Sequence, residues 1–242
     1  MVEEGEKRKQ DIASLNDALE ALRDIWYTVE QEKKKADEIL SFANDAIASN
    51  LSTIDKAIAY YIRGVIYFKQ GRYAEAEIDL KRALNKNETL GDSTRCANAH
   101  IFLAWMCEEK KEFSEAIRLC RNGIARLRSF SDSKQCVAEI FCYLAELYIF
   151  HQKDVMPSSV NHALICLFHA LDVDPPPPVA FYLLGGICET RLRDPQRAIE
   201  WYEHCVHMLS NKFFYPSLYY DYEDVKRLAQ DRLKQLKTGE SN

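Results

Sequence analysis

The sequence predicts an all-α fold built from pairs of short amphipathic helices. Residues 57–84 form two segments whose apolar positions recur every three or four residues, and Gly71 separates them. Related patterns return further along the chain, at an offset of about forty residues between the first two. Strand-like alternation of apolar and polar residues is hard to find. Together these observations favour a chain of stacked helix pairs.

The segment 57–84 explains why such pairs must stack. The apolar face of its first helix is formed by Ala57, Tyr60, Gly64 and Tyr67. The inward stripe of its second helix is formed by Tyr73, Ala76, Leu80 and Ala83. A glycine inside a helix costs roughly 1 kcal/mol relative to alanine, so Gly64 indicates a second helix packed closely against it. Gly71 supplies the backbone freedom for the turn. Neither helix can bury its face alone.

This segment resembles the tetratricopeptide repeat, in its glycines, aromatic residues and alanines and in their order across a turn. It departs from the family pattern at Arg63, where leucine is usual, and at Glu88, where proline is usual. The resemblance covers residues 57–209 well and 11–50 weakly. It implies a right-handed α-solenoid of helix-turn-helix repeats with terminal capping helices.

The rest of the chain is expected to follow in order. We expect a disordered N-terminus at 1–10, a helical hairpin or degenerate repeat at 11–50, about four repeats at 51–209, and a capping helix and tail at 210–242. Within 11–50, a small–large–small stripe is predicted at Ala36, Leu40 and Ala43. The third repeat is interrupted near 151–159. The turn of the fourth, around 193–196, is one residue longer than usual, and a final helix is predicted at 217–236.

Composition narrows the function classes. The formal net charge of −5 argues against nucleic acid as the main partner. The polar N-terminus does not read as a signal peptide, and the longest apolar stretch is too short to cross a bilayer, so we expect no membrane insertion and a cytoplasmic, or else nuclear, location. The eight cysteines form no CxxC pair and read as reduced, mostly buried side chains.

In tetratricopeptide repeat proteins the first helix of each pair lines a concave groove that binds peptides. The resemblance implies a groove lined by Ile58, Tyr61, Val65, Phe68, Asn98, Ile101, Trp105, Glu108, Cys142, Glu146, Ile149, Tyr182 and Glu189. Such a groove is apolar and aromatic at one end and acidic at the other. It suits a partner segment with an apolar anchor and basic residues. The alternative is that the chain's own terminal helices cover the apolar positions.

Other binding chemistries find less support. Some family members grip the C-terminal carboxylates of heat-shock chaperones with a cationic clamp, but the matching positions here hold no cation, so such tails are not expected as ligands. His162, Cys166 and His169 share a helix at metal-ligand spacing, yet no fourth ligand is apparent. We expect no metal and no cofactor. Hydrolase and phosphate-loop signatures were not found, and no enzyme activity is expected.

The sequence therefore predicts a noncatalytic adaptor or scaffold that binds a peptide or helix of another protein in the groove. One alternative is a chaperone-like escort that shields an apolar client segment. Another is a structural subunit that acts by self-association or through its convex surface. The identity of the partner, the pathway and the oligomeric state stay open.

Overall fold

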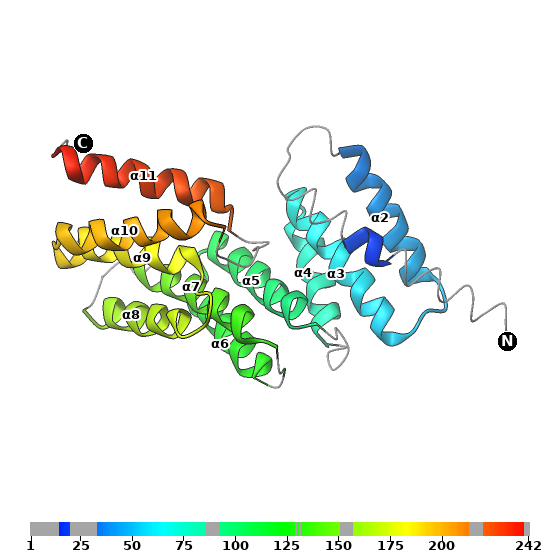
Figure 1. The fold of residues 1–242 in the computed structure, drawn as a ribbon. Helices are drawn as coiled ribbons and strands as arrows, with labels where there is room; N and C mark the ends of the chain where they lie inside the picture. Colours follow the sequence, from blue (N-terminus) through cyan, green and yellow to red (C-terminus); the bar gives the residue numbers. More distant parts are fainter. Residues whose placement is uncertain are drawn as a thin grey trace. The chain divides into compact units, whose positions relative to one another are not determined.

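The computed structural model describes residues 15–19, 33–85, 92–128, 130, 132–150, 157–212 and 220–239, and this part of the chain is helical and contains no strand (Figure 1). A short helical stretch at 15–19 precedes the labelled helices. These are α2 (Lys33–Ala48), α3 (Thr53–Lys69), α4 (Tyr73–Asn85), α5 (Ser93–Glu109), α6 (Phe113–Leu127), α7 (Lys134–Phe150), α8 (Pro157–Leu171), α9 (Pro178–Ile187), α10 (Pro195–Ser210) and α11 (Tyr222–Thr238), with a π-helical turn at Cys188–Leu192. The all-α prediction is confirmed.

The chain forms two compact units, Met1–Met106 and Cys107–Asn242, and the division falls inside α5. In the first unit α2 packs on α3, and α3 packs on α4. The second helix of this pair buries its predicted stripe completely at Ala76, Leu80 and Ala83. Fully burying a leucine contributes roughly 1.5–3 kcal/mol, so Leu80 contributes most of the stability that this stripe supplies.

The predicted stripe of α2 was correct only at Ala43. The buried residues of this helix are Ile39, Ala43 and Ala46, whereas Ala36 and Leu40 are partly exposed. Successive residues turn by about 100° around an α-helix, so choosing Leu40 in place of Ile39 misplaced the buried face by that angle.

Arg63, which departs from the family pattern, holds three helices of the first unit together. Its guanidinium donates to both carboxylate oxygens of Asp79 on α4, at 2.6 and 2.9 Å, and to Oδ1 of Asn44 on α2, at 2.8 Å. The Asp79 side chain is only 2% exposed. A fork of guanidinium N–H groups matches a carboxylate well, so a buried ion pair takes the place of the usual apolar contact.

The second unit is a succession of neighbouring helices. Contacts join α6 to α7, α7 to α8, α8 to α9, α9 to α10 and α10 to α11. The C-terminal helix α11 lies beside α10 and also touches α9 (Figure 1). The Asp221 side chain caps the N-terminus of α11 by accepting from the backbone N–H groups of Glu223 and Asp224. The predicted helix at 217–236 is thus observed at Tyr222–Thr238, while residues 213–219 lie outside the described part.

The turns within the helix pairs share one device. A residue with left-handed backbone follows the first helix of three pairs, at Gly71, Lys111 and Arg193. In the first turn, the N–H of Arg72 closes on the carbonyl of Tyr67, five residues back. In the last, the N–H of Asp194 reaches the carbonyl of Cys188, six residues back. The π-helical turn Cys188–Leu192 absorbs the extra residue that the sequence indicated.

Two glycines allow the paired helices to approach closely. A Cβ atom on Gly64 would lie 2.9 Å from Cγ of Leu80, and one on Gly185 would lie 2.6 Å from the ring of Tyr202. The expectation of close packing at Gly64 is confirmed.

None of the helices in the described part is both long and apolar enough to cross a membrane.

Candidate functional site

The structure places more than half of the predicted groove residues in the core. The buried members are Ile58, Tyr61, Val65, Asn98, Ile101, Cys142 and Ile149. A side chain such as Tyr61, at 1% exposure, offers no surface to a partner in this structure. These residues stabilise their units, and because they are buried they cannot make the predicted contact with a ligand in this structure. The Asn98 amide pairs with no other described residue.

The predicted residues of the first unit that keep exposure are aromatic. Phe68 on α3 and Trp105 on α5 are both partly exposed, and their ring centroids lie 4.8 Å apart in an edge-on arrangement. Tyr73, at the start of α4, lies 5.4 Å from Trp105 and 5.9 Å from Phe68. The buried ring of Phe102 supports Phe68 from below, at 4.9 Å. We call Phe68, Tyr73 and Trp105 the aromatic surface.

Tyr73 was assigned to an inward stripe, and that assignment was wrong. Its side chain is 37% exposed because it occupies the first position of α4, beside the turn at Gly71, where the helix pair opens. Sequence reasoning therefore missed one residue of the aromatic surface. The usable signal was position: an aromatic residue directly after a turn has no preceding helical turn to cover it.

Two predicted acidic groove residues of the second unit are already paired within the chain. Glu108 accepts a hydrogen bond from the hydroxyl of Tyr143 on α7. Glu189 accepts one from the hydroxyl of Tyr202, at 3.0 Å, and forms an ion pair with Arg232 of α11. These positions were expected to bind a basic residue of a partner. At Glu189, that basic residue is Arg232 of the protein's own C-terminal helix.

Glu146 of α7 is a carboxyl whose pKa is strongly shifted by its surroundings. Burial, reinforced by the nearby charge of Glu108, raises its pKa from 4.5 to about 8. Interaction with the hydroxyl of Tyr220, just before α11, acts in the opposite direction. Residues of the chain's own C-terminal part, Tyr220 and Arg232, thus interact with Glu146 and Glu189. Tyr182, which is partly exposed, has its pKa raised mainly by burial.

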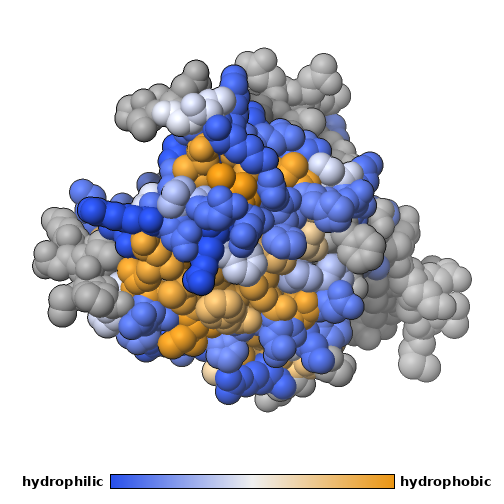
Figure 2. All heavy atoms as spheres, turned by 60° about the vertical axis from the view of Figure 1, so that its left-hand side comes forward, coloured by the Kyte–Doolittle hydropathy of each residue, from blue (hydrophilic) through white to orange (hydrophobic). Residues whose placement is uncertain are grey.

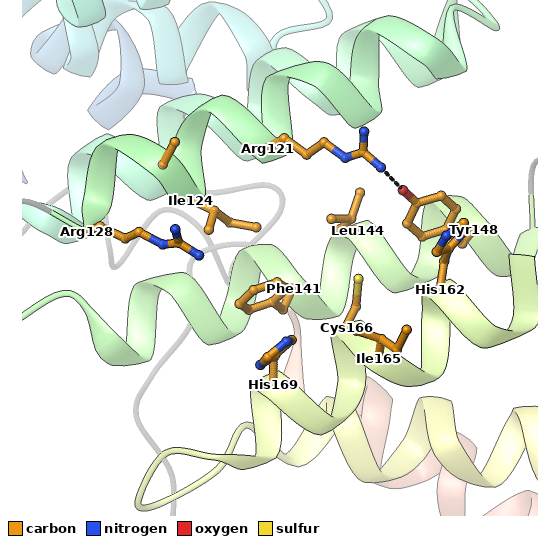
Figure 3. A pocket seen from close by; sticks show the side chains of 11 residues that line it. Arg121, Ile124, Arg128, Phe141, Leu144, Tyr148, His162, Ile165, Cys166 and His169 are labelled. Atoms are coloured by element: carbon orange, nitrogen blue, oxygen red, sulfur yellow. Dashed lines mark hydrogen bonds between the residues drawn. The ribbon is translucent and has the colours of Figure 1, made fainter.

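A separate cavity of about 380 Å³ lies among α6, α7 and α8 (Figure 3). We call it the α6–α8 pocket. Its chemistry comes from two arginines of the α6 segment, two aromatic rings of α7 and two histidines of α8. They are Arg121, Arg128, Phe141, Tyr148, His162 and His169. On α7, the pocket residues lie roughly 120° around the helix from the predicted groove positions, so the two surfaces are distinct.

The side chains around this pocket are ordered by mutual contacts. Arg121 donates from Nη2 to the hydroxyl of Tyr148 at 2.8 Å (Figure 3). The ring of His169 stacks on Phe141 at 5.1 Å, and the ring of His162 lies 5.2 Å from Tyr148. The two histidines are therefore engaged with aromatic neighbours. Within the described residues, no group of three or more possible metal ligands was found.

The eight cysteines are all free and buried, as expected. Burial raises the pKa of Cys166, beside the α6–α8 pocket, to about 11, and that of Cys205 to about 12. The pKa of Cys142 is also raised well above its usual value by burial. The thiolate is the nucleophilic form of cysteine, so these protonated thiols are poor nucleophiles at neutral pH.

Apolar side chains also reach the surface of the second unit. Figure 2 turns the side with α8–α11 toward the viewer and shows hydrophobic residues gathered among hydrophilic ones. Among the described residues of this unit, the exposed large apolar side chains are Phe150, Ile165, Phe168, Leu192 and Leu228. Contiguous exposed apolar surface of this kind often marks an interaction site.

Comparison with known proteins agrees with this geometry. The profile of the tetratricopeptide repeat family matches residues 55–129. A crystal structure of a tetratricopeptide repeat protein from Parabacteroides merdae ATCC 43184 is similar in fold, with a TM-score of 0.53 and 18% sequence identity. The match covers 97% of this chain and 80% of that one. A search of curated proteins found no match.

Proposed function

On the premise that residues 55–129 of this chain are tetratricopeptide repeats, we propose that the protein is a noncatalytic interaction module that holds a segment of another protein on its aromatic surface. Tetratricopeptide repeats typically bind other proteins. The observation that carries the proposal for this chain is the contact among Phe68, Tyr73 and Trp105, each of which keeps part of its ring exposed.

The physical case rests on what these rings offer. Tryptophan and tyrosine are enriched among residues that dominate binding energy, because they bury a large area with few rotatable bonds. Here Phe102 packs beneath Phe68, so the rings are held in place before a partner arrives. Preorganised side chains lose less conformational entropy on binding. The aromatic surface therefore favours a partner segment with an apolar anchor.

The acidic residues of the predicted groove attract a basic partner less strongly than the sequence indicated. Glu189 is already paired with Arg232, and Glu108 is bonded to Tyr143. Their charges are partly satisfied within the second unit, so they add less attraction for lysine or arginine of a ligand. We keep the apolar anchor as the defining feature of the partner.

The experiment compares the wild-type chain with a Tyr73→Ala/Trp105→Ala double variant in affinity capture with quantitative mass spectrometry. Ile78→Ala serves as the matched control, since Ile78 on the same unit is 52% exposed and lies outside the aromatic surface. A captured protein is then purified and its affinity is measured by calorimetry. Circular dichroism confirms that each variant retains its helicity.

We expect the double variant to weaken binding of the purified partner at least tenfold, which corresponds to about 1.4 kcal/mol. The control should change the affinity less than twofold. Equal affinity for the wild type and the double variant would contradict the proposal. So would equal losses in the double variant and in Ile78→Ala, because the effect would then not belong to the aromatic surface.

A further inference from the structure

We propose that the α6–α8 pocket is a second binding site, which takes an acidic peptide segment of another protein: a carboxylate side chain on the two arginines and a neighbouring apolar side chain against the aromatic wall. This site is separate from the aromatic surface and goes beyond the function proposed above. Its chemistry is also the reverse of the one expected for the groove, because it selects negative rather than positive ligands.

The first step of the argument is the state of the two arginines. Elsewhere in this unit, Arg118, Arg197 and Arg227 each pair with a carboxylate three residues earlier in the chain. The residue three before Arg121 is another arginine, and the residue three before Arg128 is alanine. The sequence thus gives Arg121 and Arg128 no helical carboxylate partner. Within the described part of the chain, neither forms an ion pair.

The second step is the geometry of the pocket. Both arginines are exposed, and both extend from the α6 segment over the cavity (Figure 3). Arg121 is oriented by the hydroxyl of Tyr148, which accepts from one of its nitrogens. A guanidinium has five N–H donors, so donors remain for a ligand after this bond. None of the described residues that line the pocket is acidic.

The third step is the charge balance. The chain carries a formal net charge of −5, yet this cavity is bordered by two full positive charges and by two histidines. A guanidinium binds a carboxylate through two parallel hydrogen bonds, and the pair gains strength where surrounding apolar groups exclude water. A carboxylate ligand therefore complements the pocket better than a neutral or basic one.

The fourth step decides between a peptide and a small free anion. The floor of the pocket is apolar, with Ile124, Leu144 and Cys166 buried. Ile165 lines the cavity and is 54% exposed, and Phe168, one helical turn further on α8, is 57% exposed. A small polar anion would leave these side chains in water. A peptide that carries an apolar residue beside its carboxylate would cover them as well.

The size of the cavity agrees with this occupant. A volume of about 380 Å³ is near the lower end of the range of roughly 300–1,000 Å³ for ligand pockets. The pocket is thus suited to one or two side chains of an extended segment rather than to a whole helix.

The test uses the purified full chain and an array of synthetic peptides in which one or two glutamates flank leucine or phenylalanine. Counterpart peptides carry glutamine in place of each glutamate. Binding is measured by fluorescence anisotropy for the wild type, Arg128→Gln, Arg121→Gln/Arg128→Gln and Arg118→Gln. The last variant is the matched control: it also removes a positive charge from α6, at an exposed arginine that does not line the pocket.

We expect glutamate peptides to bind, glutamine counterparts to bind at least tenfold more weakly, and the double variant to lose at least tenfold in affinity. Arg118→Gln should lose less than twofold. Arg128→Gln is included because Arg128 forms no ion pair within the described residues, so its substitution should not disturb folding. Ile165→Asp, which adds a carboxylate at an exposed position on the rim, should weaken binding to a similar extent.

Three outcomes would overturn the proposal. The first is no binding of any array member below millimolar concentration, and the second is equal loss in Arg118→Gln and in the double variant. The third is tighter, arginine-dependent binding of inorganic phosphate or of a short RNA, which would make the pocket a phosphate site. The Tyr73→Ala/Trp105→Ala variant should bind the peptides as the wild type does, so failure of this site and failure of the aromatic surface are separable.

Discussion

The two units of this protein shield a carboxylate from water in different ways. In the first unit, the 2%-exposed side chain of Asp79 is paired through two hydrogen bonds with the guanidinium of Arg63. In the second, the Glu146 carboxyl is enclosed near another acid, Glu108, and its pKa is raised to about 8. One unit thus stabilises the charged form of its buried acid, and the other favours the neutral form.

This difference teaches how a repeat fold can tolerate polar residues at helix-packing positions. A buried charge is costly unless a partner charge and hydrogen bonds compensate for it. Where the chain supplies a guanidinium, as at Asp79, the ion pair becomes part of the packing. Where it supplies a hydroxyl and a second carboxylate, as at Glu146, stability becomes dependent on pH.

The largest expected effect comes from breaking the pair in the first unit. Arg63→Ala leaves the buried Asp79 with only the longer ion pair to Arg82, at 3.8 Å, and removal of one partner of a buried pair costs about 3–5 kcal/mol. Urea denaturation at pH 7 measures the loss. Arg72→Ala is the matched control, since Arg72 pairs with Glu75 in an exposed ion pair of the same unit, and little change is expected there. Equal losses in the two variants would show that burial of Asp79 is not decisive.

The next effect separates the two units by pH. The folded pKa of Glu146, about 8, lies above its ordinary value of 4.5, so the folded state holds the proton more tightly. Its contribution to stability is fully present below about pH 4.5 and is lost as the pH rises through about 8. Glu146→Gln mimics the neutral form and should match the wild type near pH 4.5.

At pH 8 the same variant should be more stable than the wild type, by on the order of 2–4 kcal/mol. Chemical denaturation across this pH range gives the comparison directly. Parallel pH profiles for wild type and Glu146→Gln would mean that Glu146 does not titrate as its surroundings indicate.

The smallest effect concerns the contact between α11 and Glu189. Arg232→Ala should weaken the docking of this helix by about 1 kcal/mol, because the ion pair is partly open to solvent. Hydrogen exchange of residues 222–238 should accelerate. Lys237→Ala is the control, as Lys237 pairs with Glu203 where both side chains are exposed. Unchanged exchange in Arg232→Ala would indicate that α11 is held by its apolar contacts alone.

The architecture was largely predictable from the sequence. Helix pairing follows from apolar periodicity, and the close contacts of Gly64 and the turn at Gly71 follow from the absence of a side chain. The extra residue near Arg193 was also apparent, although its form, a π-helical turn, was not. These features depend on residues that are close together in the sequence, so the sequence alone indicates them.

The candidate site was less predictable, because it depends on which side chains are covered by residues from other helices. Spacing identified the inner positions of α3 and α5 but could not reveal that Tyr61 and Val65 are buried. It likewise could not show that Arg232, more than forty residues away along the chain, reaches Glu189. The α6–α8 pocket combines side chains of three helices, so no single stretch of sequence predicts it.

The central claim is that a partner binds the aromatic surface of the first unit, while α11 keeps its place over Glu189. Hydrogen-exchange mass spectrometry of the wild-type chain, with and without the purified partner, tests this most directly. The account predicts new protection around Phe68–Tyr73 and around Trp105, with exchange over 222–238 unchanged. Protection limited to α9, or faster exchange of α11 on binding, would contradict it.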